Sequence, residues 1–349
     1  MKALIVVTGR GLGGDASIAI NFIKKLEQSG VECEIALDES APGLLFKKKG
    51  YDWHKISVPA AGGHVATKAS TIKAAFKMLT ASFKIRSLIK KLDVDFVFGI
   101  IGGGAIVGAV GAKLANVPGF SLISTPLDTK ICPKLSRCYV TPESPNFNLD
   151  NLPGNTSKTF LPSNNFEKGN FDNALQKLKK IENFDENKKT ILFSSGSSIF
   201  KGIIDGINNF AEFSDDYNLL LIGLPLQDDY LDNLNPNIIY LSYIDWLGDL
   251  YDFVDLAIVT DDGLSIQEAI LHHVPTVCLT RVKWGRYHDM ASVFKGATIE
   301  AEVYNLNEKI QEALSTSDEL KENSKKFAVD ISASTNNLID DILKNVNEK

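Results

Sequence analysis

Short apolar runs alternate with stretches of helical periodicity along most of the chain. The runs 3–7, 33–37 and 95–101 are long enough for strands that are buried on both faces of a sheet. The segment 16–29, between the first two runs, has the spacing of an amphipathic helix. The same order of strand, turn and helix begins again at 190–193. This pattern predicts an α/β protein made of two Rossmann-like domains with parallel sheets.

The two halves of the pattern are separated by a segment rich in Pro, Asn and Ser, which ends near residues 162–169. A chain of 349 residues is long enough for two domains, each with its own core. We therefore expect an N-terminal domain over 1–163 and a C-terminal domain over 164–330. The tail from Leu306 onward is predicted to be helical.

Composition narrows the classes of function. With 44% hydrophobic and 23% charged residues the chain is typical of a soluble globular protein. Its net charge of −6 argues against nucleic-acid binding. The four cysteines are scattered and favour reduced thiols in a cytosol. No apolar run approaches the roughly 18 residues of a membrane-spanning helix, so we expect a soluble or peripheral protein.

Small residues follow several predicted strands. Gly11, Gly13 and Gly14 follow the first strand, Gly102–Gly104 follow the strand that ends near 101, and Ser194–Ser198 follow the strand at 190–193. Backbone N–H groups in such turns are able to bind anions where a helix begins. Each turn taken alone is weak evidence, because small residues are common at any junction of a strand and a helix.

A further junction carries an acidic side chain. Leu256–Val259 is a predicted strand, 260–263 a turn, and Ser265–His272 a helix that contains Glu268. From this position a carboxylate can accept hydrogen bonds from vicinal hydroxyls, as an acidic residue near a Rossmann turn does with ribose. Alternatively, Glu268 only interacts favourably with the positive end of the helix dipole.

Residues 64–92 contain seven Lys or Arg and no acidic residue. An apolar stripe with helical spacing is flanked by lysines, which gives a basic amphipathic segment of one helix, or of two if 80–82 break it. Such a segment either lies on an anionic membrane or packs its stripe on the protein core. The stripe consists of Ile72, Phe76, Leu79 and Phe83, and the flanking lysines are Lys73, Lys77 and Lys84.

Residues 261–279 read DDGLSIQEAILHHVPTVCL, which resembles the donor-nucleotide motif of the MurG-like glycosyltransferases. Members of this family add an N-acetylhexosamine to a lipid-linked cell-wall precursor. The resemblance implies the GT-B fold, in which two Rossmann-like domains face each other across a central cleft. It further implies that a C-terminal helix at about 331–349 packs on the first domain, and that the basic segment docks on the membrane.

The same resemblance implies roles for single residues. Glu268 would hold the ribose of a UDP-sugar, and Gly263, Leu264 and Ser265 would line the sugar and phosphate pocket. The other donor-side positions are Gly196 and Ser197 for the diphosphate, Ile244 for uracil, and Arg286 and Tyr287 in place of a paired amide motif that selects the sugar. The acceptor-side loops would contain Gly11, Gly13 and Gly14, and Gly102, Gly103 and Gly104.

The chain departs from the family pattern at several positions. Asp15 stands where the family has a histidine near the reacting centre; it is either a general base or the N-cap of the following helix. A family arginine near the domain boundary is missing, which leaves Lys201 or Arg286 as candidates for phosphate binding. The family's acidic residue after the strand at 120–124 is not evident.

We therefore predict an inverting glycosyltransferase that uses a UDP-sugar and a lipid-linked acceptor, without a metal or other cofactor. It would be cytoplasmic and peripheral on the inner face of the cell membrane, where it meets an anionic surface. A glycolipid synthase, a UDP-sugar epimerase and a non-catalytic nucleotide-sugar-binding relative that acts as a membrane partner are the alternatives.

Overall fold

The computed structural model describes residues 1–8, 13–57, 68–163, 169–212, 215–262, 264–283 and 287–348, with only the backbone of 68–75. The chain divides into two compact units, one of residues 1–164 and 333–349, the other of residues 165–332. Each unit is built on one parallel sheet, which confirms the predicted fold class. Among the described helices, none combines the length and the apolar character that a membrane span requires.

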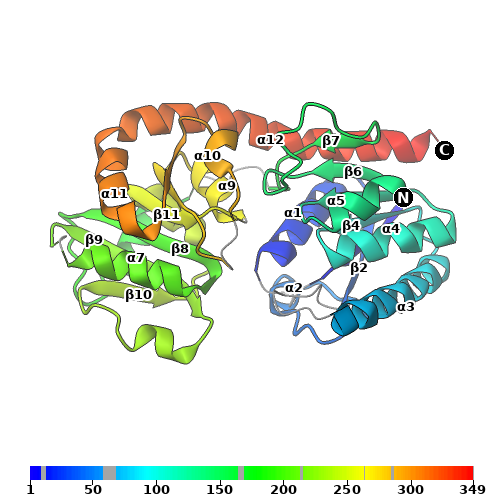
Figure 1. Ribbon diagram of the computed structural model, residues 1–349, viewed down its shortest axis with the longest axis horizontal. Helices are drawn as coiled ribbons and strands as arrows, with labels where there is room; N and C mark the ends of the chain where they lie inside the picture. The colour runs from blue at the N-terminus through cyan, green and yellow to red at the C-terminus, as the bar shows by residue number, and fades with distance from the viewer. Residues whose placement is uncertain are drawn as a thin grey trace. The chain divides into compact units, whose positions relative to one another are not determined.

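The first unit contains a seven-stranded parallel sheet in the order β3-β2-β1-β4-β5-β6-β7 (Figure 1). Its strands are β1 (Lys2–Val7), β2 (Glu32–Asp38), β3 (His54–Ile56), β4 (Phe96–Ile100), β5 (Gly119–Ile123), β6 (Arg137–Val140) and β7 (Thr156–Lys158). The helices are α1 (Gly14–Gln28), α2 (Leu44–Lys48), α3 (Lys68–Leu92), α4 (Gly103–Ala115), α5 (Asp128–Ile131) and the 3-10 helix η1 (Cys132–Lys134).

The core of this unit follows from the apolar runs. Residues 3–7 of β1 are fully buried, as expected for a central strand with helices on both faces. On one face Phe22 of α1 stacks on Phe98 of β4 with ring centroids 3.9 Å apart. On the other, α3 lies along α4, where Ile85 contacts Gly111 (Figure 1).

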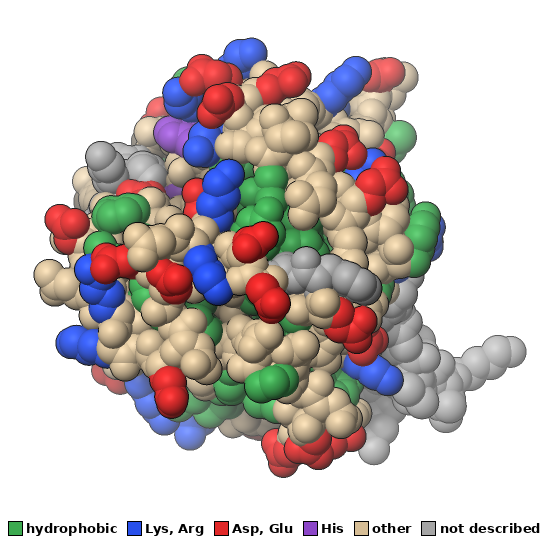
Figure 2. Space-filling view, turned by 90° about the vertical axis from the view of Figure 1, so that its left-hand side faces the viewer, with side chains coloured by type: hydrophobic (Ala, Val, Ile, Leu, Met, Phe, Trp, Pro, Cys, Tyr) green, Lys and Arg blue, Asp and Glu red, His purple; other side chains and the backbone are tan. Residues whose placement is uncertain are grey.

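The second unit contains a six-stranded parallel sheet in the order β10-β9-β8-β11-β12-β13. Its strands are β8 (Lys189–Ile199), β9 (Tyr217–Pro225), β10 (Ile238–Ser242), β11 (Leu256–Thr260), β12 (Thr276–Leu279) and β13 (Thr298–Ala301). The helices are α6 (Phe171–Leu178), α7 (Lys201–Ala211), η2 (Asp228–Leu231), α8 (Leu247–Phe253), α9 (Leu264–Leu271), α10 (Met290–Val293), η3 (Val303–Asn305), α11 (Leu306–Ser315) and α12 (Ser317–Asn347). Figure 2 shows one face of the molecule, on which acidic and basic side chains are interspersed.

The last helix, α12, begins in the second unit and ends in the first. Asp341 accepts hydrogen bonds from the Arg137 guanidinium at 2.6 and 2.9 Å and from the Tyr139 hydroxyl at 2.6 Å. Seven residues earlier, the Ser334 hydroxyl bonds to Thr159 Oγ1 at 2.9 Å. The end of the chain is therefore tied to β6 and to the residue that follows β7 in the first sheet.

One local expectation is wrong, and one alternative that the sequence left open is resolved by the structure. The small-residue turn at 194–198 is a bulge inside β8, because Ser198 and Ile199 pair again with β9 after a shift in register. Helix α3 continues through 80–82, so the basic segment forms one helix there. The short strands β3, β7 and β13 were not predicted.

Candidate functional site

Each sheet has a point at which the strand order reverses. In the second unit the reversal lies between β8 and β11, and in the first unit between β1 and β4. Ligands of open α/β sheets bind beside the carboxyl ends of the strands at such switch points. The predicted small-residue turns at 194–198 and 260–263, and the loops that contain Gly13 and Gly102, occupy these ends. Gly11 and Gly263 lie outside the described residues.

Helix α9 begins at the switch point of the second unit, directly after β11. Its first turn is held by the Tyr251 hydroxyl, which donates to the backbone oxygen of Ser265 at 3.2 Å. Leu264 is buried beside it. The preceding Asp261 is almost fully buried and accepts a hydrogen bond from the His288 N–H at 2.7 Å, while burial raises the pKa of this carboxyl to about 7. These contacts fix the start of the helix beside the sheet edge.

Glu268 lies one turn into α9 and is half-buried. Its carboxylate has no hydrogen-bond or ion-pair partner in the part of the chain that the structure describes. Loss of water on burial raises its pKa to about 7. A carboxylate left without partners near a switch point is able to accept hydrogen bonds from a ligand that supplies hydroxyl groups.

The bulge of β8 brings a second predicted residue to this helix. Gly196 has a φ of 85°, which favours glycine, and its N–H donates to Ser194 Oγ at 3.1 Å. A Cβ atom at Gly196 would lie 3.7 Å from Ser265 Oγ and 3.9 Å from Lys283 Nζ. The structure therefore brings Gly196 and Ser265 together and adds Lys283, which the sequence analysis did not single out. Ser197 follows in the same bulge and is half-buried.

Three further donor-side residues were predicted, Ile244, Arg286 and Tyr287. Ile244 is half-buried, two residues beyond the end of β10. Tyr287 is exposed, and its hydroxyl donates to Glu300 Oε2 at 3.0 Å while the Arg281 guanidinium lies 5.3 Å from its ring. Arg286 lies outside the described residues.

Asp15 is found in the first turn of α1, at the switch point of the first unit. The N-cap of this helix is Gly13 and no side chain caps it, so the N-cap role for Asp15 is wrong. Its half-buried carboxylate has no partner among the residues described, and burial raises its pKa to about 6. A carboxyl group with this pKa is able to act as a base near neutral pH.

The glycines after β4 have packing roles. Gly104 lies so close to β1 that a Cβ atom there would be 2.7 Å from the Val6 carbonyl oxygen. Gly102 has a φ of 61°, and its N–H donates to Asp128 Oδ2 at 2.6 Å. Asp128, which the sequence analysis did not single out, is an acidic residue in the segment after β5. It is fully buried and also accepts from the Thr125 N–H at 2.8 Å, so it holds the loop in place.

Comparison with known proteins gives consistent results. Residues 5–121 match the glycosyltransferase family 28 N-terminal domain. A UDP-N-acetylglucosamine--N-acetylmuramyl-(pentapeptide) pyrophosphoryl-undecaprenol N-acetylglucosamine transferase of Clostridium tetani is 31% identical over 236 residues, 64% of this chain and 62% of the relative. The protein of the same name from Clostridium novyi is 24% identical over 98% of this chain and 97% of its own length. The crystal structure of Acinetobacter baumannii MurG has a TM-score of 0.67 at 17% identity and covers 98% of this chain and 99% of that chain.

The chain has the GT-B fold and is similar to MurG. The alignment with the Clostridium tetani relative spans less than two thirds of that protein's length. The fold also occurs in a putative UDP-N-acetylglucosamine 2-epimerase from Listeria monocytogenes, with a TM-score of 0.66 at 12% identity over 100% of this chain and 97% of that chain. Fold likeness alone therefore does not separate transfer from epimerisation.

Helix α3 has two apolar faces. Ala81, Ile85 and Ile89 are buried against the rest of the unit. The predicted stripe points away from them, and its described members Phe76, Leu79 and Phe83 are 68%, 50% and 50% exposed. The expectation that the stripe packs on the core is therefore wrong for these residues. Lys77 and Lys84 beside them are exposed, whereas the side chains of Ile72 and Lys73 lie outside the described residues.

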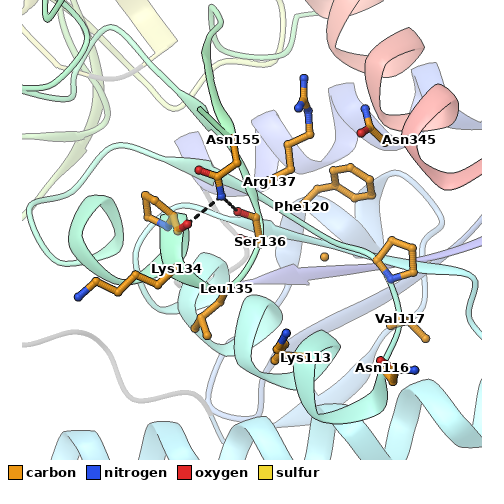
Figure 3. Close-up of a pocket in the computed structure, with 13 residues that line it drawn as sticks. Lys113, Asn116, Val117, Phe120, Lys134, Leu135, Ser136, Arg137, Asn155 and Asn345 are labelled. Carbon is orange, nitrogen blue, oxygen red and sulfur yellow. Dashed lines mark hydrogen bonds between the residues drawn. The ribbon is translucent and has the colours of Figure 1, made fainter. Parts of the chain in front are cut away.

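The first sheet also has a hollow of about 660 Å³ at its amino-terminal edge, opposite the carboxyl edge where its switch point lies (Figure 3). It is lined by the end of α4 and the starts of β5 and β6, where Asn155 donates to the carbonyl oxygens of Pro133 and Ser136 at 2.7 and 2.8 Å. No predicted site residue lines this hollow.

Proposed function

We propose that this protein is an inverting glycosyltransferase that moves an N-acetylhexosamine or related sugar from a UDP-sugar to a lipid-linked acceptor of cell-wall precursor synthesis. The observation that carries the proposal is the position of Glu268, without a described partner, one turn into the helix that starts at a switch point beside Gly196. The names of the similar proteins supply the donor and acceptor classes.

The residues around the start of α9 explain how the donor would bind. The Glu268 carboxylate accepts hydrogen bonds from the two ribose hydroxyls, which stabilise its ionised form and lower the pKa that burial has raised. The diphosphate lies against the start of α9, where the Ser265 hydroxyl and the helix dipole favour negative charge. Ile244, at the carboxyl edge of the same sheet, lies on the uracil side.

Asp15 takes the role of general base at the switch point of the first unit. Its carboxylate accepts the proton of the acceptor hydroxyl while the hydroxyl oxygen bonds to the anomeric carbon. The bond from that carbon to the diphosphate oxygen breaks in the same step, and UDP leaves with the electron pair. Attack from the face opposite the leaving group inverts the anomeric centre. The dipole of α9 stabilises the charge that develops on UDP, so no metal ion is needed.

The acceptor is membrane-bound in this proposal, and α3 supplies the contact. Phe76, Leu79 and Phe83 insert between lipids, while Lys77 and Lys84 meet anionic headgroups on the inner face of the cell membrane. This places the protein at the membrane surface as a peripheral protein.

Transfer is tested with purified protein, lipid extract and UDP-sugars labelled in the sugar. We expect label in the lipid fraction, release of UDP, and the same rate in the presence of EDTA. Label that stays in the nucleotide pool as a second UDP-sugar would identify an epimerase. UDP-sugar binding without any turnover would identify a non-catalytic relative. Either result would overturn the proposal.

A further inference from the structure

Lys283 lies in the loop after β12 and points to the bulge of β8. Only 14% of its side chain is exposed, and its ammonium is 2.7 Å from Asp262 Oδ1. The ammonium also lies 5.6 Å from the centre of the Phe200 ring, at the end of β8. A lysine that is this buried is almost always paired, and here the partner is Asp262. The contacts place a positive charge at the carboxyl edge of the sheet.

The space in front of this ammonium is bounded on three sides. The Cβ position of Gly196 is open, with Lys283 Nζ 3.9 Å away and Ser265 Oγ 3.7 Å away. Any side chain at residue 196 would fill this space. A glycine, a hydroxyl and an ammonium around one small opening at a helix start are suited to phosphate oxygens.

Asp262 occupies only part of the hydrogen-bonding capacity of Lys283. An ammonium has three N–H donors, and the contact with Asp262 occupies one of them. Asp262 itself accepts from the Thr260 hydroxyl at 3.2 Å, which fixes the carboxylate and with it the lysine. Asp262 is therefore a positioning residue that keeps the ammonium beside Gly196.

We propose that Lys283 is the cation that binds the diphosphate of the sugar nucleotide in this protein, with Asp262 holding it in place. This inference rests on the proposed function. Lys283 replaces the sequence-based candidate Lys201, whereas Arg286 lies outside the described residues. Lys201 is exposed at the first position of α7, and none of the contacts described for the chain link it to Gly196.

The test compares UDP with uridine, which lacks phosphate, in calorimetric titrations of full-length variants. Lys283→Met removes the charge and keeps the length of the side chain, and Lys201→Met is the matched control. We expect Lys283→Met to weaken UDP binding by about tenfold to hundredfold, as for hydrogen bonds to charged groups. Uridine binding should not change, Lys283→Arg should retain most of the UDP affinity, and Lys201→Met should bind both ligands as the parent does.

If the parent protein fails to bind UDP, the proposed function fails. If the parent binds UDP and Lys283→Met binds it equally well, only the assignment of Lys283 fails. Equal losses of affinity for UDP and for uridine would also overturn the assignment, because Lys283 would then not act on the charge of the diphosphate. If Lys283→Met does not fold, the double variant Asp262→Asn with Lys283→Met is titrated instead, because it no longer contains the carboxylate that Lys283 pairs with in the parent. The same outcomes then decide the assignment of Lys283.

Discussion

At the scale of single residues, Asp15 and Glu268 are carboxyl groups with raised pKa values and different tasks. Burial raises the pKa of Asp15 to about 6 and that of Glu268 to about 7. In the proposed reaction Asp15 must take up a proton, whereas Glu268 must stay ionised to accept hydrogen bonds from hydroxyl groups. Donor binding itself stabilises the ionised form of Glu268, but Asp15 remains basic enough to act near neutral pH.

Asp15→Asn should therefore lower kcat by about a hundredfold or more, because an amide cannot accept the proton. UDP affinity should not change, since Asp15 does not contact the nucleotide in this proposal. In the parent, kcat should fall as the pH drops through about 6, where Asp15 becomes protonated. The pH profile of the initial rate measures this. An unchanged rate for Asp15→Asn would remove the base assignment.

Glu268→Gln should stabilise the ligand-free protein at alkaline pH. Because folding raises the pKa of Glu268 from 4.5 to about 7, the folded state binds more protons than the unfolded state between these values. The free energy of unfolding of the parent therefore falls as the pH rises through this window. Glutamine mimics the protonated form, so the variant should be more stable than the parent by about 1–3 kcal/mol at pH 8, and similar at pH 4. Thermal unfolding at both pH values measures the difference; equal stability at pH 8 would contradict the burial of the charge.

The sequence predicted the places of some candidate residues in the fold and not others, for physical reasons. The place of Glu268 was predictable because it depends only on one strand, one turn and one helix that are adjacent in the chain. Lys283 and Asp128 were not, because each is defined by contacts with segments distant in sequence, at Gly196 and at Gly102. Periodicity does not report such contacts.

At the scale of elements, the junction between β1 and α4 explains why Gly104 is a glycine. Gly104→Ala would place a methyl group 2.7 Å from the Val6 carbonyl oxygen, so β1 or α4 must move. We expect a loss of about 1–3 kcal/mol in the free energy of unfolding. Gly14→Ala is the control, because nothing lies within 4 Å of its Cβ position at the start of α1, and it should change stability by less than about 1 kcal/mol. Urea unfolding measures both, and equal effects would contradict the close packing.

The predicted elements matched best where a buried run ends in turn residues. Strand β11 extends one residue beyond its predicted end, and α9 begins and ends one residue earlier than predicted. The bulge of β8 was taken for a turn, because only its pairing with β9 shows that the strand resumes at Ser198. The apolar stripe of α3 was recognised from the sequence. Its orientation was not, because it depends on the packing of Ile85 against Gly111, and hydrophobic periodicity does not report such a contact.

The exposed stripe of α3 gives a prediction about membrane binding. Replacing Phe76, Leu79 and Phe83 together with serine should lower the affinity for anionic vesicles by about a hundredfold, because three apolar side chains no longer enter the lipid. Folding should be retained, since all three are exposed. Val329→Ser on α12 is the control, because Val329 is an apolar residue that is 69% exposed and belongs to the second unit. Vesicle sedimentation measures the affinity, and unchanged sedimentation of the triple variant would contradict the membrane role.

At the scale of the whole molecule, the two units repeat one plan. Each has a parallel sheet with a reversal of strand order, and each places a partly buried carboxylate near the reversal, Asp15 in the first unit and Glu268 in the second. The proposed reaction divides the work accordingly, with the acceptor proton taken in one unit and the nucleotide held in the other.

The most direct test of this account is calorimetric titration of UDP into the parent protein, Glu268→Gln and Glu308→Gln. Glu308 is the matched control, because its side chain is 77% exposed on α11 of the same unit. We predict one UDP per chain for the parent and the control, and binding weaker by about tenfold or more for Glu268→Gln. A parent protein that does not bind UDP, or equal affinity in Glu268→Gln, would contradict the account.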